Sequence, residues 1–169
     1  MRSLGISHFS PQSSVLSPQS GRAVGAVVAL VLSFACGRTE PGPASLDTKN
    51  ELCRFCRMPV SDARLAAQLV ASGEEPKFFD DIGCLRDHLI QSPAVRGSVA
   101  YVADHRTGAW THASQAVFSR CPALETPMSS HLVAHANQAS RDADPTAAGG
   151  APVVPREIFG PAGPPGGAR

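Results

Sequence analysis

Three sulfur-bearing side chains stand close together in the segment LCRFCRMPVSD, residues 52–62. Cys53 and Cys56 are three positions apart, so a tight turn can direct both sulfurs to one side. Met58, two residues further on, can add a thioether to that side. Thiolate and thioether are soft ligands, and together they favour Cu(I) over hard cations such as Mg²⁺ or Ca²⁺. The segment is therefore a candidate Cu(I) site.

Spacing alone leaves other interpretations of this segment open. Zn²⁺ also binds thiolates, although its structural sites usually add a second Cys or His pair and rarely use Met. In an oxidising compartment, Cys53 and Cys56 can form a disulfide and exchange electrons with other thiols. Met58 can also be an ordinary core side chain, which is the commoner role of methionine.

Other cysteines and histidines are additional candidates. Cys84 lies four residues before His88 in a predicted helix, so both can face one way, although a cysteine beside an apolar face is typically a small buried hydrophobe. His131 follows Met128 by three residues, and Cys121 lies in a predicted loop. The sequence has no Ser-His-Asp spacing, phosphate-binding loop or dinucleotide-binding glycine motif, so a hydrolase or nucleotide-dependent function lacks support.

Composition narrows the function classes further. The chain has 169 residues, with 15 Lys and Arg against 14 Asp and Glu. This balance, without a basic cluster, supplies no positive stripe for a phosphate backbone, so we expect no nucleic-acid partner. One Trp, one Tyr and seven Phe give few aromatic side chains. The core must therefore be small and built mainly from Ala, Val and Leu, as in one modest domain.

The N-terminal stretch indicates export. Residues 23–35, AVGAVVALVLSFA, are uncharged and mostly apolar but too few to cross a bilayer, which takes about 20 residues. They are typical of the hydrophobic region of a secretory signal, so we predict a signal peptide over residues 1–35. Cys36 then resembles the acylated cysteine of a bacterial lipoprotein, which would anchor the protein to a membrane. Ser33-Phe34-Ala35 would equally serve an ordinary signal peptidase, so lipid attachment at Cys36 and soluble export both stay open.

The pattern of the residues after the predicted signal peptide indicates one α+β domain. Residues 36–50 are predicted to be the anchor cysteine and a flexible linker, residues 51–159 the domain, and residues 160–169 a disordered Pro/Gly tail. We expect two similar halves, each with short antiparallel strands and a helix. The predicted strands are 64–71, 77–80, 98–104, 109–112, 131–136 and 153–154, and the predicted helices are 81–90, 114–119 and 137–144.

Four blocks of the sequence resemble a known family. In order they are LCRFCRMPVSDARLAAQLV, FFDDIGCLRDHL, VAYVADHRTGAWTHASQAVF and ALETPMSSHLVAHA. They are similar to successive blocks of the NosL family of copper-binding accessory lipoproteins, which are linked to nitrous-oxide reductase. The resemblance covers roughly residues 51–155, and four ordered blocks are far more specific than one CxxC motif.

The resemblance implies a small α+β protein of two similar halves, without enzymatic activity, on the periplasmic side of a bacterial membrane. Such a protein carries Cu(I) and hands it to the copper-sulfide centre of the reductase or to its assembly factors. Cys56 and Met58 match the family's Cys-x-Met element, and Met128 in TPMSS matches a second methionine in a small-residue loop. Cys53 extends the motif to the CxxCxM form, whose members are not always tied to nitrous-oxide reduction.

We therefore expect an exported Cu(I) metallochaperone in which tight thiolates hold the ion and displaceable thioethers let it leave. Its client is a periplasmic cuproenzyme. This hypothesis requires the loop after Pro127 to fold back onto the CxxCxM turn. The alternatives are a thiol-disulfide redox protein and a structural zinc-binding lipoprotein. The expected copper ligands are Cys56, Met58, Met128 and Cys53, with Cys84 and His131 as additional candidates.

Overall fold

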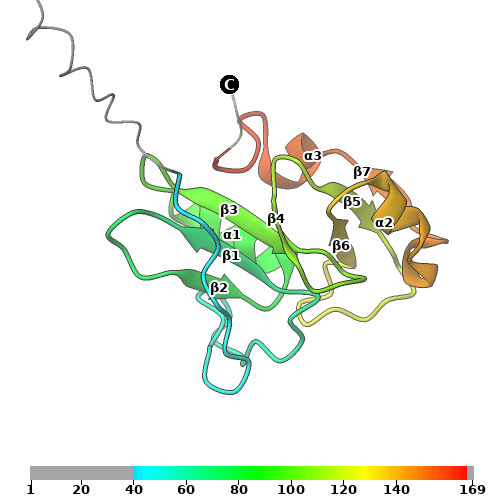
Figure 1. The fold of residues 1–169 in the computed structure, drawn as a ribbon, viewed down its shortest axis with the longest axis horizontal. Helices are drawn as coiled ribbons and strands as arrows, with labels where there is room; N and C mark the ends of the chain where they lie inside the picture. Colours follow the sequence, from blue (N-terminus) through cyan, green and yellow to red (C-terminus); the bar gives the residue numbers. More distant parts are fainter. Residues whose placement is uncertain (1–39, 167–169) are drawn as a thin grey trace, which may run out of the picture. The chain divides into compact units, whose positions relative to one another are not determined.

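The first half of the domain is built on a four-stranded antiparallel sheet. The structure, a computed structural model, describes residues 40–166 (Figure 1). The sheet has the order β2-β1-β3-β4, so the first strand of the chain lies between the second and the third. β1 and β3 are buried along their whole length, which explains their apolar sequences AQLV and VAYVA. The strands are β1 (Ala67–Val70), β2 (Lys77–Phe79), β3 (Val99–Ala103) and β4 (Trp110–His112).

One helix, α1 (Ile82–Gln91), lies between β2 and β3 in the sequence and contacts both β1 and β2. It begins at the cap residue Asp81, whose carboxylate accepts a hydrogen bond from the backbone amide of Gly83 at 2.6 Å. Its buried residues lie in its first turns, Ile82 to Leu85. The helix ends just before Pro93, a residue that cannot continue a helix. α1 therefore presents its N-terminal end, not its C-terminal end, to the core.

The second half repeats this plan with shorter elements. Its antiparallel sheet has the order β6-β5-β7, again with the first strand in the middle. The elements are β5 (Val117–Arg120), β6 (Leu132–His135), α2 (Gln138–Asp142), the 3₁₀ helix η2 (Pro145–Ala147), β7 (Ala151–Val153) and α3 (Pro155–Phe159).

The two halves correspond position by position around their helices. In each half, a helix follows the second strand, and its cap residue lies two positions after that strand ends: Asp81 for α1 and Asn137 for α2. Cys84 is the third residue of α1, and Ser140 is the third residue of α2. The predicted α+β class, with two similar halves of antiparallel strands and a helix, is confirmed.

One core and one strand contact join the halves. Asp104, directly after β3, forms a parallel bridge with Ala134 in β6. The next amide, that of His105, donates to the Ala134 carbonyl at 2.8 Å. Buried side chains from both sheets, among them Phe79 and Phe118, belong to a single hydrophobic cluster. The positions of the loops between the sheets are thereby fixed.

Two elements differ from the sequence-based expectation. The predicted helix over residues 114–119 is wrong, because Val117–Arg120 form β5, the central strand of the second sheet. Pairing on both sides outweighs the local helical preference of the Ala and Ser residues before it. The helix α3 was not predicted, because it has no side-chain cap and only five residues. Its start is marked by Pro155 at the first helical position.

The ends of the described chain pack against the domain. Residues 40–50, predicted as linker, are tied down where Gln68 Oε1 accepts from the Ala44 amide at 2.7 Å and the Tyr101 hydroxyl donates to the Pro41 carbonyl at 2.8 Å. Residues 160–166 also differ from the disordered tail expected of them, because the Pro165 carbonyl accepts from the Ala100 amide at 3.0 Å. The predicted signal peptide and Cys36 lie outside the described residues. Within residues 40–166, no helix is both long and apolar enough to cross a membrane.

Candidate metal centre

The CxxCxM segment forms a tight closed turn. The Cys53 amide donates to the Met58 carbonyl at 2.8 Å, and the Arg57 amide donates to the Cys53 carbonyl at 3.0 Å. Arg57 adopts a left-handed backbone conformation, with φ of 69°, which lets the chain reverse. The Arg54 amide donates to the Phe78 carbonyl at 2.7 Å, so the turn is attached to β2.

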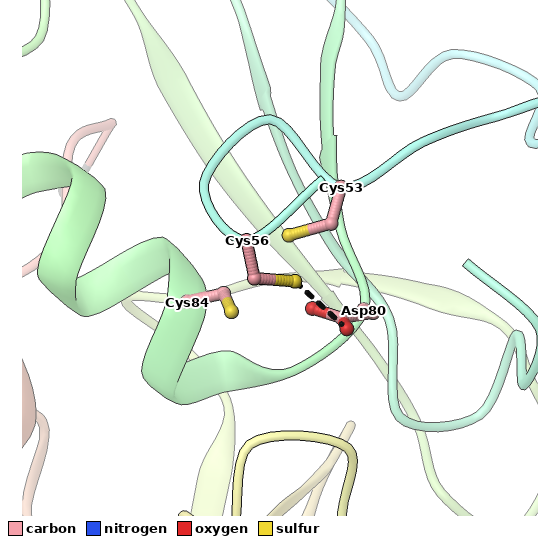
Figure 2. A group of neighbouring side chains, drawn as sticks. All are labelled: Cys53, Cys56, Asp80 and Cys84. Carbon is pink, nitrogen blue, oxygen red and sulfur yellow. Dashed lines mark hydrogen bonds between the residues drawn. The ribbon is translucent and has the colours of Figure 1, made fainter. Parts of the chain in front are cut away.

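This turn brings two cysteines to the place where β2 leads into α1. Cys53 and Cys56 lie on the turn, Asp80 follows β2, and Cys84 lies in the first turn of α1 (Figure 2). One potential ligand atom from each of these four side chains lies within 4.8 Å of all the others. We call these four residues the cysteine group. Three separate chain segments therefore supply three sulfurs and a carboxylate to one possible metal-binding site.

The cysteine group is buried except on one side. Cys53, Cys84 and Asp80 are 0%, 1% and 2% exposed, whereas Cys56 is only half-buried. The Cys56 thiol donates a hydrogen bond to Asp80 Oδ2 at 3.2 Å, but Asp80 Oδ1 is buried without a hydrogen-bond partner. A buried carboxylate oxygen without a partner is costly, and a bound cation would offset that cost.

The thiols of the group have different affinities for protons. Hydrogen bonding from Cys84, aided by the backbone amides of Asp80 and Cys56, lowers the pKa of Cys53 to about 6. Burial raises the pKa of Cys56 to about 11. The pKa of Cys84 is also raised, because its proton is held by Cys53 and burial disfavours its thiolate. These shifts favour a thiolate at Cys53 and thiols at Cys56 and Cys84 near neutral pH, so metal binding would release the protons of the thiols it uses.

The two methionines expected as ligands are exposed, and the backbone of each is bonded to a residue in or next to the cysteine group. Met58 closes the turn that carries Cys53 and Cys56, and its side chain is 40% exposed. Met128 is 44% exposed, and its amide donates to Asp81 Oδ2 at 3.1 Å. The loop after Pro127 therefore folds back onto the start of α1. Asp81, which it contacts there, follows Asp80 directly in the sequence.

The other candidates lie outside the cysteine group. His131 places Nδ1 2.8 Å from the Leu124 carbonyl oxygen. The His88 ring packs against Phe79 in a tilted arrangement, with ring centroids 5.2 Å apart, and His88 does not belong to the cysteine group. Cys121 is buried in a small separate cluster. All four cysteines of residues 40–166 carry free thiols.

Two parts of the site chemistry were missed by sequence reasoning. Asp80 was not among the expected ligands, and the signal that could have revealed it is the doubled aspartate between β2 and α1, of which Asp81 is the helix cap. A second group, His105, His135 and Asp144, also brings three potential ligand atoms within 4.8 Å of one another. Its members are far apart in the sequence and share no motif spacing.

Fold and site together define a small α+β protein with a possible metal-binding site. In comparisons with known proteins, no family model, curated protein or solved structure matches the chain.

Proposed function

We propose that this protein is an exported Cu(I) metallochaperone of the NosL type. The observation that carries this proposal is the convergence of three thiols, two from the CxxCxM turn and one from α1, with ligand atoms within 4.8 Å of one another. Thiolates are the ligands that Cu(I) prefers. The thiol of Cys56 is the most accessible of the three, so an ion bound there can leave by exchange with an incoming ligand.

Met58 and Met128 favour Cu(I) over Zn²⁺ as the bound ion. Met58 and Met128 are both partly exposed, and the backbone of each is fixed by hydrogen bonds next to the cysteine group. Neutral thioethers add weak, exchangeable donors without adding charge. A carrier needs such donors, because a site made of thiolates alone would retain its cargo.

The cellular setting is part of the proposal and rests on the sequence. The apolar stretch before Cys36 supports export to the periplasmic side of a bacterial membrane, with Cys36 as the lipid attachment. The four blocks that resemble the NosL family support a cuproenzyme client, with the copper-sulfide centre of nitrous-oxide reductase as the first candidate.

Titration of the reduced protein with Cu(I) under a competing chelator tests the proposal. We expect one Cu(I) per chain, and lower affinity in Met58→Ala and in Met128→Ala. Cys121→Ser is the matched control, because Cys121 lies outside the cysteine group. An affinity that is unchanged in both methionine variants would contradict thioether participation.

Two observations keep other functions as alternatives. The buried Asp80 carboxylate is a hard donor that suits Zn²⁺ better than Cu(I), which favours a structural zinc site. In that case a chelator should unfold the domain, as monitored by circular dichroism. The lowered pKa of Cys53, about 6, favours its thiolate, and because Cys53 is fully buried, thiol-disulfide exchange would have to start at the half-buried Cys56. If the protein acts in thiol-disulfide exchange, Met58→Ala and Met128→Ala should exchange thiols at the wild-type rate.

A further inference from the structure

The group formed by His105, His135 and Asp144 lies apart from the cysteine group and plays no part in the proposed function. His105 follows β3, His135 is the last residue of β6, and Asp144 caps η2. The three side chains are 6%, 0% and 5% exposed. Elements from both halves of the domain therefore bury two imidazoles and one carboxylate together.

Both imidazoles contact the same carboxylate oxygen. His105 Nδ1 lies 2.6 Å and His135 Nε2 lies 2.9 Å from Asp144 Oδ2, while Asp144 Oδ1 accepts from the Thr146 amide at 2.9 Å. An ionised carboxylate only accepts hydrogen bonds, so each ring donates through the nitrogen that faces Asp144. An ion that replaced these two N–H protons would be bound by both facing nitrogens and by Asp144 Oδ2.

The far nitrogen of His135 adds no ligand to this group. His135 Nδ1 is buried, has no hydrogen-bond partner in the protein, and is not the nitrogen that faces Asp144. Buried polar atoms are nearly always paired, because leaving one unpaired costs about 1–3 kcal/mol, so the hydrogen bonds of the group do not satisfy the His135 ring. The two facing nitrogens, together with Asp144 Oδ2, are the atoms placed to share one ion.

We propose that His105, His135 and Asp144 form a second metal site, which binds a divalent transition-metal ion such as Zn²⁺. Imidazole and carboxylate suit borderline divalent ions, and the group has no sulfur to favour Cu(I). Zn²⁺ binds nitrogen at about 2.0–2.1 Å and carboxylate oxygen at about 2.0–2.2 Å, so the three side chains need to separate only slightly to admit it. The chain would then hold two ions of different softness at separate places.

The test counts divalent ions on the reduced full-length protein and asks where they bind. Zn²⁺ is titrated against a chromophoric chelator, and Co²⁺ serves as a spectroscopic stand-in, because its charge-transfer bands report thiolate ligation. We expect two Zn²⁺ per chain. His135→Gln should lose one of them and leave the thiolate bands of bound Co²⁺ unchanged. The control is His112→Gln, which removes a histidine outside the group and should still bind two.

A measurement without substitutions guards against misfolding of the His135 variant. In the NMR spectrum of the wild type, Zn²⁺ should shift the ring signals of His105 and His135 but not those of His112. One ion per chain, with unmoved His105 and His135 signals, would overturn the proposal and leave the group as a hydrogen-bonded structural contact. Neither result depends on Cu(I) binding, so this site and the carrier function fail or stand separately.

Discussion

The carboxylate of Asp81 accepts a hydrogen bond from the amide of Met128, 47 residues later in the chain, at 3.1 Å. The same oxygen accepts from the Thr126 hydroxyl at 2.7 Å, and the other oxygen caps α1 through the Gly83 amide. One side chain therefore fixes both the helix that carries Cys84 and the loop that carries Met128. We expect this carboxylate to position the methionine loop relative to the cysteine group.

Thr126→Val leaves the helix cap in place but removes two hydrogen bonds of the loop, the one to Asp81 and the one that the Thr126 hydroxyl accepts from the His131 amide at 3.1 Å. If Met128 binds copper, the looser loop should weaken Cu(I) binding by about three- to tenfold. The measurement is chelator competition under anaerobic conditions. Thr111→Val, on β4, is the control and should bind as the wild type does. Wild-type affinity in Thr126→Val, together with weakened binding in Met128→Ala, would show that the tether does not position the thioether.

Cys84→Ser should separate the role of a buried thiol in metal binding from its role in packing. The serine keeps the approximate size of the side chain but removes a soft ligand, so Cu(I) affinity should fall at least about tenfold. Cys121→Ser makes the same change at another buried site and should leave affinity unaltered. Equal affinities in the two variants would mean that Cys84 is only a packing residue.

Asp104 makes the stability of the protein depend on acid pH. Burial raises the pKa of this carboxyl, but hydrogen bonds from the Ala136 amide, the Ser140 hydroxyl and Thr107 outweigh it and lower the pKa from 3.8 to about 2. Because the pKa is lower in the folded state, the stabilisation is present above pH 4. It is lost as the pH falls from about 4 to 2, and amounts to ~2 kcal/mol.

Denaturant unfolding across that pH range checks the role of Asp104. Asp104→Asn should be less stable than the wild type at pH 7, and its stability should fall less steeply between pH 4 and pH 2. Asp142→Asn, an exposed carboxylate on α2, should keep the wild-type slope. Parallel profiles for the wild type and Asp104→Asn would contradict the assignment.

Gly150 is required by close packing against Cys121. A Cβ at this position would lie 2.6 Å from Cys121 Sγ and 3.2 Å from the Ala147 carbonyl oxygen. Gly150→Ala should therefore cost about 1–3 kcal/mol of the free energy of unfolding. Gly149→Ala, which meets nothing within 4 Å, should change it by less than about 0.5 kcal/mol. Cys121→Ala should relieve part of the Gly150→Ala cost in the double variant, and strictly additive costs would count against this contact.

Local signals in the sequence predicted the first half of the domain well. The predicted strands over 64–71 and 77–80 and the predicted helix over 81–90 end within a few residues of β1, β2 and α1. The same reasoning failed at Val117–Arg120, because the identity of a central strand is decided by partners on both sides that lie far along the chain. The CxxCxM motif is local and could be found. Asp80 and Cys84 join the cysteines of this motif only because β2 and α1 meet the CxxCxM turn in the folded chain. The spacing of residues in the sequence does not reveal that contact.

The correspondence between Cys84 and Ser140 shows what one helix position can carry. Ser140 donates to Asp104 at 2.6 Å in the second half, at the helix position where the first half has a thiol. In both halves the first strand lies between the second and the third, whichever side chain occupies that position. The same backbone plan therefore accepts either a sulfur in a possible metal-binding site or a hydroxyl that ties a helix to a strand end.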